Sequence, residues 1–414
     1  MKTIGIIAEF NPFHNGHLHL IDTCKKALNA DFCIVVMSGD FVQRGTPAMV
    51  DKFTRTKMAL ECGADLVFEL PVYYSCASAE YFAQGAVALL DKLGVVDTLV
   101  FGSECGDIEK MEKVASVLAN EPPIFQEKLS SALKEGKNYA SARETALFSA
   151  LKESENEDCS KEYSDIISSP NNILGIEYIK ALKKTCSNIK PFTITRTGEG
   201  YNSLTINQTA SASSIRNQVD TYGFSDDSIK KLEIAMPKKC LSLLLENQER
   251  MPSLDLFSKL LNYKLIMGKD NGYTEYLDIS EDFSNKIMSN LEKYQDFTTF
   301  CHLLKSKDLS FSRISRALLH ILLDIKGENM KEYKEDNFTS YARILGMKSD
   351  ASSLVKMIKE NSSIPVISNL KASNSIDEKL YKRLLTENLR ASEVYNMLCP
   401  SKSVNEYRMK PIIY

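Results

Sequence analysis

Two histidines three positions apart, His14 and His17, have the types and spacing for phosphate chemistry, in the sequence HNGH. They follow an apolar run and a turn that contains Pro12, so we expect them where a helix begins. A helix N-terminus offers free N–H groups and a partial positive charge, and it therefore binds phosphate. Gly16 lets a nucleotide approach the backbone closely. The pattern predicts two imidazoles that donate hydrogen bonds to an α-phosphate as charge builds up during attack.

A second phosphate-type element lies far downstream, in the sequence SASSIR at residues 211–216. Serines at a helix start, with Arg216 in the first turn, can hold the β- and γ-phosphates. Together the two elements predict that the protein orients an incoming oxygen at phosphorus while pyrophosphate leaves, without a nucleophilic side chain. The alternative interpretation is structural: His14 and His17 pack or cap at a turn, and Arg216 is a surface residue.

The segments around these motifs alternate between two patterns. Apolar, β-branched runs predict strands at 3–10, 32–39, 64–71 and 96–104, and helical patterns lie between them at 17–28, 51–62 and 78–93. Continuous apolar strands that alternate with helices indicate a parallel sheet covered on both faces. Such sheets bind ligands at the carboxyl edge, where His14 and His17 follow the first strand. The predicted fold class is therefore α/β, with a Rossmann-like parallel sheet.

The remaining segments complete two predicted domains. In the first half we expect helical sequence over about 107–151, a polar and acidic loop at 152–165, helices at 171–182 and 211–219, and a strand at 191–198. Beyond about residue 221 helical patterns dominate, at 226–236, 253–267, 284–295, 311–325 and 377–398, with a candidate strand in 362–370. We therefore predict a nucleotide-binding domain at 1–220 and a mainly α-helical domain at 221–414.

Composition narrows the class of protein. The chain has 414 residues, 43% of them hydrophobic and 25% charged, and contains no run of the ~18–20 apolar residues that a membrane helix needs. Ten scattered cysteines form no CxxC pair and no cluster at zinc spacing, so we expect reduced thiols in a cytoplasmic protein and no metal site. Residues 221–414 carry 29 Lys and Arg against 26 Asp and Glu, and residues 1–220 carry 22 against 28. That asymmetry permits a nucleic-acid surface in the second half.

The wording of the motifs resembles one known family. HxGH followed by a late SSxxR-type helix start is similar to the nucleotidyltransferase superfamily, although the usual Asp of its first turn is Asn11 here. The segments AEFNPFHNGH, MSGDFVQRG, PNNILGIEYIKAL and TRTGEGY resemble the bacterial tRNA(Met) cytidine acetate ligases over the full length. The resemblance implies a ligase that makes acetyl-adenylate from ATP and acetate, and then acetylates the exocyclic amine of the wobble cytidine of elongator tRNA(Met) to give N(4)-acetylcytidine. It also implies Mg²⁺, held chiefly by phosphate oxygens of ATP.

The resemblance further implies an ATP site, residue by residue. The cradle is Ile7, Ala8, Glu9, Phe10, Asn11, Pro12, Phe13, His14, Asn15, Gly16, His17, Leu18, His19 and Leu20. Gly102 would admit the adenosine, and either Asn171 or, in preference, Asn172 would contact the nucleotide. The rest of the implied site is Arg196, Thr197, Ser213, Ser214 and Arg216. The alternative interpretation, from the residues alone, is that Gly102 serves a turn, the asparagines cap a helix and Arg196 is solvated.

Three charged residues near the second predicted strand are further candidates. Asp40 follows Ser38 and Gly39 at the carboxyl edge of the sheet, so we expect it, with His14 and His17, among the catalytic residues. Lys52 and Arg55 would then reach acetate or phosphate. The alternative is that Asp40 forms a structural turn and that the two cations are surface charges on a helix.

Basic residues interleaved with tyrosines suggest an RNA surface in the second half. The candidates for RNA contact are Arg313, Arg316, Arg343, Lys382 and Arg383, with Lys348, Lys379, Lys402, Arg408 and Lys410 nearby in sequence. The wobble base lies in a single-stranded loop, so it can enter the site without the breaking of a duplex. The alternative is that these residues only solvate the outer faces of amphipathic helices.

Two other functions remain open at this point. One is a small-molecule adenylyltransferase of the HxGH superfamily, which would leave AMP in its product and need no tRNA. The other is a non-catalytic regulator that binds nucleotide or RNA, which would bind ATP without cleaving it. The long helical half argues against the first, and intact His14, His17 and Arg216 argue against the second.

Overall fold

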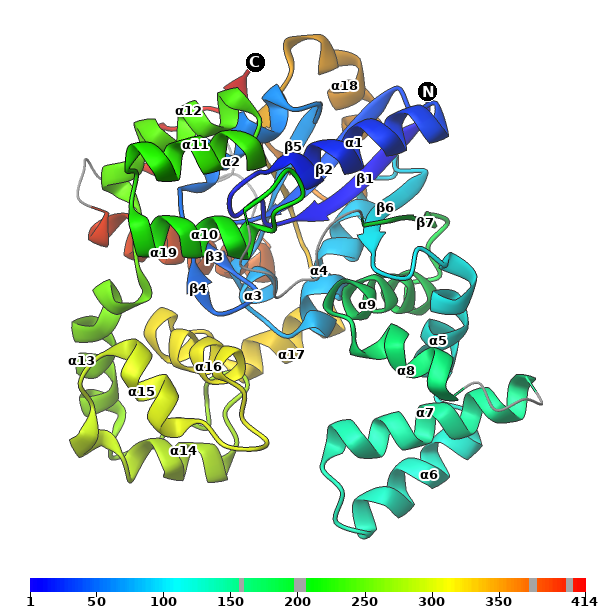
Figure 1. The fold of residues 1–414 in the computed structure, drawn as a ribbon, viewed down its shortest axis with the longest axis vertical. Coiled ribbons are helices and arrows are strands. Elements are labelled where there is room, and N and C mark those ends of the chain that lie inside the picture. The colour runs from blue at the N-terminus through cyan, green and yellow to red at the C-terminus, as the bar shows by residue number, and fades with distance from the viewer. Residues whose placement is uncertain (156–159, 197–205, 372–377, 400–404) are drawn as a thin grey trace.

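An eight-stranded, mostly parallel sheet forms the centre of the computed structural model, which describes residues 1–155, 160–196, 206–371, 378–399 and 405–414 (Figure 1). Its main path runs β10-β8-β5-β2-β1-β6-β7, and β9 pairs with β8. The predicted strands are confirmed as β1 (Thr3–Ala8), β2 (Phe32–Ser38), β5 (Leu66–Leu70), β6 (Thr98–Ser103) and β7 (Lys190–Thr195), which pair in parallel. Strand β1 lies inside the sheet, between β2 and β6, so the HNGH motif follows a switch in strand order.

Helices cover both faces of the sheet, because alternate residues of the strands point to opposite sides. Ile4 and Ile6 of β1 belong to one buried cluster and Ile7 to the other. The first cluster packs under α1 (Asn15–Leu28), α2 (Lys52–Glu61), α10 (Ala212–Tyr222), α11 (Asp226–Ala235) and α12 (Lys238–Glu246). The second packs under α3 (Val72–Ser75), α4 (Ala79–Lys92), α5 (Ile108–Asn120) and α9 (Pro170–Lys184). The three-layer α/β fold class is confirmed.

A pair of helices projects from the body between α5 and α9. It consists of α6 (Pro123–Lys134) and α7 (Tyr139–Glu155), which pack against each other below α5 (Figure 1). Helix α8 (Ser160–Ser168) then leads back to α9. The prediction of a loop over 152–165 is wrong where the structure describes it, because 152–155 continue α7 and 160–165 lie in α8. Residues 156–159 lie outside the described part.

The second half is mainly helical and returns to the sheet. Its helices are α13 (Ser258–Gly268), α14 (Glu281–Met288), α15 (Phe297–Leu304), α16 (Phe311–Leu323), α17 (Gly327–Glu335), α18 (Ser352–Asn361) and α19 (Lys379–Leu398). Strand β8 (Ala342–Met347) pairs antiparallel with β5, and β9 (Val366–Ile367) and β10 (Ile412–Ile413) pair with β8. The candidate strand in 362–370 is therefore present as β9. The domain boundary near 220 stays a proposal, since the chain beyond it adds three strands to the same sheet.

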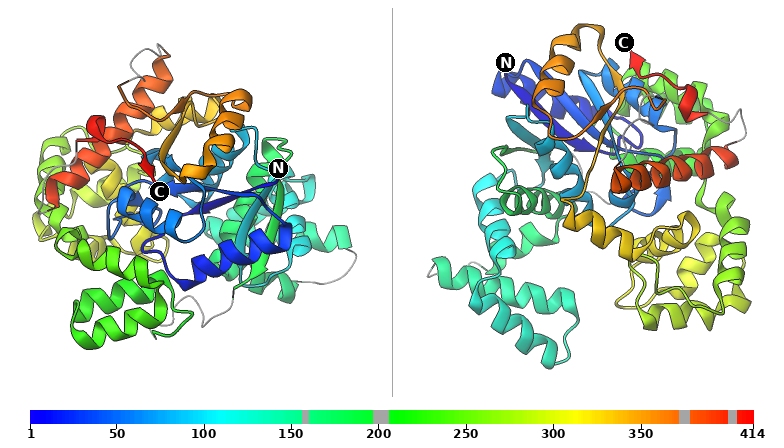
Figure 2. Two further views of the ribbon diagram at one scale, coloured as in Figure 1. Left: turned by 90° about the horizontal axis from the view of Figure 1, so that it is seen from above. Right: turned by 180° about the vertical axis from the view of Figure 1, so that it is seen from behind.

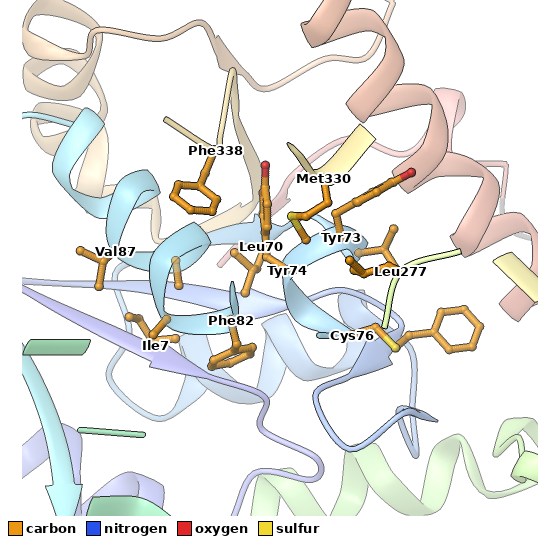
Figure 3. Close-up of a cluster of buried hydrophobic side chains, with 14 of the residues drawn as sticks. Ile7, Leu70, Tyr73, Tyr74, Cys76, Phe82, Val87, Leu277, Met330 and Phe338 are labelled. Atoms are coloured by element: carbon orange, nitrogen blue, oxygen red, sulfur yellow. The ribbon is translucent and has the colours of Figure 1, made fainter. Parts of the chain in front are cut away.

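One buried cluster joins the two halves of the sequence (Figure 3). Ile7 of β1 and Leu70 of β5 contribute from the sheet, and Tyr74 and Phe82 from the helices that follow β5. Leu277, Met330 and Phe338 of the second half belong to the same cluster. Figure 2 shows from two further sides that α19 lies against the body rather than apart from it. Because this core is continuous and close-packed, the helices of the second half are held in fixed positions relative to the carboxyl edge of the sheet.

Most cysteines are packing residues. The structure describes nine of them, all free, and six of these are buried: Cys24, Cys33, Cys62, Cys76, Cys240 and Cys301. Burial raises the pKa of the Cys76 thiol to about 12, so the thiol stays protonated and unreactive. The prediction that the thiols pack as small apolar residues holds for these six, whereas Cys186 is exposed and Cys105 and Cys399 are partly buried. Among the described residues, no helix is long and apolar enough to cross a membrane.

Candidate functional site

A cavity of about 350 Å³ opens at the carboxyl edge of the sheet, beside the end of β1. The starts of α1, α9 and α10 line it, together with Gly102 of β6 and the tip of a hairpin formed by β3 (Phe41–Val42) and β4 (Thr46–Pro47). Arg44, Arg196 and Arg216 line it with one described carboxylate, Glu9. Three guanidinium groups against one carboxylate give the cavity a positive charge, which suits an anionic ligand.

His14 and His17 face each other at the start of α1, with ring centroids 3.8 Å apart. The backbone N–H of Gly16 donates to Nδ1 of His14 at 3.0 Å, and the N–H of His14 donates to Nδ1 of His17 at 3.2 Å. Because each Nδ1 accepts a hydrogen bond, each neutral ring carries its proton on Nε2. This reciprocal capping holds both rings in place at the cavity wall. Capping and ligand binding are therefore compatible here.

Both imidazoles are neutral at physiological pH. Burial, with Arg196 and Arg216 nearby, lowers the pKa of His14 to about 3. Burial, His14 and Arg196 lower the pKa of His17 well below its usual range. The two rings therefore act as neutral N–H donors, and the hydrogen bonds that they donate become stronger when negative charge develops on a bound phosphate.

The start of α10 supplies the second predicted element. Ser211 caps the helix by accepting from the N–H of Ser214 at 3.1 Å, and its hydroxyl lies 2.8 Å from that of Ser214. Arg216 donates to Oγ of Ser213 at 3.0 Å and to the carbonyl of Asn11 at 2.5 Å. Ser213 and Arg216 line the cavity, whereas Ser214 is buried behind them. The structure thus brings residues 205 positions apart to one phosphate-sized site.

The end of β6 and the start of α9 hold each other by paired hydrogen bonds. The carboxylate of Glu104 accepts from the side chain of Asn171 at 2.7 Å and from the N–H of Asn172 at 2.9 Å. In return, Oδ1 of Asn172 accepts from the N–H groups of Glu104 and Cys105. Asn171 lines the cavity, whereas Asn172 is 1% exposed and is not among the described lining residues. The geometry favours Asn171 for ligand contact and gives Asn172 a positioning role.

Gly102 allows a close approach of Arg196. A Cβ at Gly102 would lie 3.0 Å from Cγ of Arg196, so a side chain there would displace the arginine. The N–H of Arg196 donates to the carbonyl of Ser103, which fixes the end of β7 beside β6. Both Gly102 and Arg196 line the cavity. Thr197 lies outside the described residues.

Some residues of the segment 7–20 line the cavity, and others support the turn beneath it. The lining residues of the segment are Ile7, Ala8, Glu9, Phe10, Asn11, His14, His17 and Leu20. Pro12 and Phe13 are buried beneath the turn, and Asn15, Gly16, Leu18 and His19 are not among the described lining residues. Asn11 supports the turn, because its Oδ1 accepts from the N–H of Met49 at 2.7 Å.

Asp40, Lys52 and Arg55 are buried away from the cavity. Asp40 accepts from the backbone N–H of Lys52 at 3.0 Å, and burial raises the pKa of its carboxyl. Arg55 is fully buried and donates to the carbonyls of Glu9, Ser38, Gly39 and Val50. None of the three is among the described residues that line the cavity, so the expected contact of Lys52 or Arg55 with acetate or phosphate is not supported. Arg55 instead fixes the carboxyl ends of β1 and β2.

Lys52 belongs to a buried ion network. Its Nζ lies 2.6 Å from carboxylate oxygens of both Glu69 and Glu406, and 2.8 Å from Oγ of Ser392. Arg343 of β8 pairs with the same two carboxylates, at 2.9 Å to Glu69 and 2.5 Å to Glu406. Arg343 is 4% exposed, so its guanidinium is not available to RNA at the surface. Its predicted RNA contact is not supported by this position.

The other predicted RNA residues differ in exposure. Arg313 and Lys382 are exposed. Arg383 is half-buried, donates to Glu332 at 2.8 Å and stacks on the Tyr333 ring. Arg316 is half-buried against Asp278 and the hairpin. Of the neighbouring cations, Lys348 pairs with Asp65, Lys379, Arg408 and Lys410 are exposed, and Lys402 lies outside the described residues.

Sequence reasoning missed several site residues, among them Glu104, Arg44 and Tyr178. Glu104 comes directly after the fourth strand in FGSE, and that position was a usable signal. Arg44 comes from the hairpin tip, where a two-strand hairpin in MSGDFVQRG gives little periodicity to detect. Tyr178 is buried in α9 and reaches the apolar wall with Phe82 and Phe101. Among the described residues no group of three or more His, Cys, Asp or Glu side chains is placed to hold a metal ion.

Comparisons with known proteins agree with one another. The family model described as HIGH Nucleotidyl Transferase matches residues 1–410. The chain is 40% identical to a tRNA(Met) cytidine acetate ligase of Clostridium perfringens, over all of both chains. It is 39% identical to the protein of that name from Thermoanaerobacter sp., over 98% of this chain and 97% of the relative.

Two solved structures have the same fold. Thermotoga maritima TmcAL bound with alpha-thio ATP aligns with a TM-score of 0.91 at 30% identity, over 100% of this chain and 99% of that one. The apo form of the Thermotoga protein aligns with a TM-score of 0.92 at 30% identity, with the same coverage. The likeness extends over both halves of the chain, including the helices beyond residue 220.

Proposed function

This chain belongs to the tRNA(Met) cytidine acetate ligase family of the HIGH nucleotidyl transferases, and we propose that it uses ATP to join acetate to the wobble cytidine of elongator tRNA(Met). The observation that carries the proposal is the pair of neutral imidazoles, His14 and His17, beside Arg216 and the start of α10 in one positive cavity. This arrangement suits a nucleoside triphosphate whose α-phosphate gains charge during the reaction.

The first step is adenylation of acetate. A carboxylate oxygen of acetate attacks the α-phosphorus of ATP, the bond to the bridging oxygen breaks, and pyrophosphate leaves with the electron pair. The Nε2–H groups of His14 and His17 donate to the α-phosphate oxygens, and Arg216 with Ser213 holds the leaving phosphates. In this scheme the adenosine lies toward Gly102 and Asn171, and a side chain at 102 would displace Arg196 beside it. Asp40 supports the start of α2 and does not touch the substrates in this scheme.

Mg²⁺ accompanies the nucleotide in this proposal. The described part of the cavity offers one carboxylate, Glu9, and Glu9 already accepts from the N–H of Gln43 at 2.8 Å. That donor set fits an ion held mainly by phosphate oxygens and water, which is how Mg²⁺ usually binds with nucleotides. The ion would neutralise phosphate charge, while the chain itself orients the α-phosphate.

The second step transfers the acetyl group to RNA. The exocyclic amine of cytidine attacks the carbonyl carbon of acetyl-adenylate, AMP leaves, and the amine loses a proton. The apolar wall of Phe82, Phe101 and Tyr178 helps to keep water from the mixed anhydride. The cations Lys379, Lys382, Arg383 and Arg390 line one face of α19, and with the exposed Arg313 they are our candidates for contact with tRNA phosphates.

An acetate-dependent formation of acetyl-adenylate tests the first step. Purified protein, ATP, Mg²⁺ and labelled acetate would be incubated without tRNA, and the products separated for labelled acetyl-AMP and pyrophosphate. We expect both products in equal amounts, and on addition of tRNA we expect the label to move from acetyl-AMP to the RNA while AMP appears. Incorporation of AMP into another small acceptor, with no use of acetate, would instead favour the small-molecule adenylyltransferase.

A further inference from the structure

The hairpin at residues 41–47 connects the cavity to the helical half. Its two strands pair Phe41 with Pro47 and Val42 with Thr46, and the tip residues Gln43, Arg44 and Gly45 turn between them. The side chains of Gln43 and Arg44 line the cavity. The tip therefore forms a wall of the site and does not belong to the HNGH or SASSIR motif.

The backbone of the tip is held from both sides. On the cavity side, the N–H of Gln43 donates to Glu9 at 2.8 Å. On the helical side, Oγ of Ser315 donates to the carbonyl of Gly45 at 2.5 Å, and Nη1 of Arg316 donates to the carbonyl of Gln43 at 3.3 Å. Fixing these groups fixes the direction in which the side chain of Arg44 leaves the tip.

Helix α16 also touches the tip directly. Gly45 has a φ of +75°, and a Cβ on it would lie 2.4 Å from the backbone nitrogen of Arg316. Only glycine permits this approach of hairpin and helix. Arg316 itself is half-buried, and its Nε lies 4.0 Å from a carboxylate oxygen of Asp278. Arg316 therefore belongs to the contact between the hairpin and α16, and it is not placed as a surface residue that would contact RNA.

Arg44 lies among like charges. Arg44, Arg216 and Glu9 all line the same cavity. Burial lowers the pKa of the Arg44 guanidinium, the charge of Arg216 lowers it further, and the charge of Glu9 opposes both effects. Two guanidinium groups in one cavity repel each other, and an anion bound between them reduces that repulsion. Arg216 is at the start of α10, where we place the leaving phosphates. An anion with several negative oxygens at that place would meet both guanidinium groups.

We propose that Arg44 contacts the β- and γ-phosphates of ATP and stabilises the leaving pyrophosphate, and that Arg316 is a positioning residue that holds Arg44 through the backbone of Gln43. The inference rests on the proposed function, since it assumes that a triphosphate occupies the cavity. The inference assigns Arg316 a role at the adenylation site in place of the RNA contact that the sequence predicted. The step itself is the one given above: the α-phosphorus gains the acetate oxygen and loses pyrophosphate.

The test compares the affinities for ATP and AMP, because only ATP carries the phosphates that Arg44 would contact. Isothermal titration would be run on the full-length wild type and on Arg44→Ala, Arg44→Lys, Arg316→Ala and the double variant. We expect Arg44→Ala to weaken ATP binding by about 10- to 100-fold with AMP binding unchanged, and Arg44→Lys to recover part of the loss. Lys307→Ala, which removes an exposed cation before α16, is the matched control and should bind both nucleotides as the wild type does.

The double variant separates positioning from general damage. If Arg316 acts through Arg44, Arg316→Ala weakens ATP binding in the wild type by several-fold and adds nothing in the Arg44→Ala background. Unchanged ATP affinity in Arg44→Ala would overturn the contact. Equal losses for ATP and AMP in Arg316→Ala, present in both backgrounds, would overturn the positioning role. Binding needs no acetate, so a wild type that binds ATP but forms no acetyl-adenylate would contradict the proposed function alone.

Discussion

At the scale of single residues, neutral histidines are the central feature of the site. Each ring uses Nδ1 to cap α1 and keeps Nε2–H for the cavity, so one hydrogen-bond pattern serves both the fold and the ligand. A charged imidazole would be costly here, because burial first and then the charges of Arg196 and Arg216 lower the pKa of His14. In our proposal the arginines bind the anion, and the imidazoles stabilise the charge that develops during the reaction.

Replacement of His17 tests that division of roles. We expect His17→Ala to lower the rate of acetyl-adenylate formation by about 100- to 1000-fold, as loss of one donor to a developing oxyanion does, with little change in the affinity for ATP. Single-turnover rates and titrations on the same preparation measure the two quantities. His302→Ala, at an exposed position in α15, serves as the control and should retain the wild-type rate. A normally active His17→Ala would contradict our interpretation of the motif.

The low pKa of His14 also predicts a pH dependence of stability. The unfolded chain binds a proton at His14 below about pH 6.5, whereas the folded chain does not until about pH 3, so stability falls as pH falls through this window. The slope amounts to about 1.4 kcal/mol per pH unit for one proton. Urea unfolding at pH 7.5 and 5.5 should therefore show a smaller loss for His14→Gln than for the wild type. Equal losses in both proteins would show that His14 is not held neutral.

At the scale of elements, the paired hydrogen bonds of Glu104 with Asn171 and Asn172 join β6 to α9 and fix the position of Asn171. Removal of the Asn172 side chain leaves the N–H groups of Glu104 and Cys105 without their acceptor and loosens the start of α9. We expect Asn172→Ala to destabilise the protein by about 1–3 kcal/mol and to weaken the binding of AMP as well as ATP. Denaturant unfolding and nucleotide titration measure both effects. Asn171→Ala is the comparison: we expect it to weaken binding with a smaller effect on stability.

Elements also show what the sequence could and could not predict. The strands 3–10, 32–39, 64–71, 96–104 and 191–198 were predictable because continuous apolar runs mark buried parallel strands. The two phosphate-type motifs predicted that His14 and Arg216 belong to one site, and both residues line the same cavity. Strand β8 was missed because its pairing with β5 joins residues far apart in the sequence. Lys52, Arg55 and Arg343 seemed to be surface or ligand cations because their buried partners also lie far away in the chain.

At the scale of the whole molecule, the C-terminal segment packs against the sheet and the helices of the first half. Glu406, in the 3₁₀ helix Glu406–Arg408, pairs with Lys52 and Arg343, and β10 then joins the sheet. Burial raises the pKa of Glu406, but the charges of Lys52 and Arg343 dominate and lower it to about 2. A carboxylate near the C-terminal end thus shares with Glu69 the neutralisation of one cation from α2 and one from β8.

Loss of that carboxylate should destabilise the whole protein. We expect Glu406→Gln to lower the free energy of unfolding by about 3 kcal/mol, because it leaves buried cations without one of their partners. Urea unfolding near pH 7 gives the value. Glu360→Gln removes an exposed carboxylate, 3.9 Å from Lys356, and should change stability by less than about 0.5 kcal/mol. Equal effects of the two substitutions would show that the buried network contributes no more than a surface pair.

The transfer of labelled acetate to tRNA tests the central claim most directly. Purified protein, ATP and Mg²⁺ would be mixed with an elongator tRNA(Met) transcript, and in parallel with a transcript whose wobble cytidine is replaced by uridine. The account predicts label on the first transcript only, dependent on ATP and lost in His17→Ala. Absence of label from both transcripts, or equal labelling of both, would contradict it.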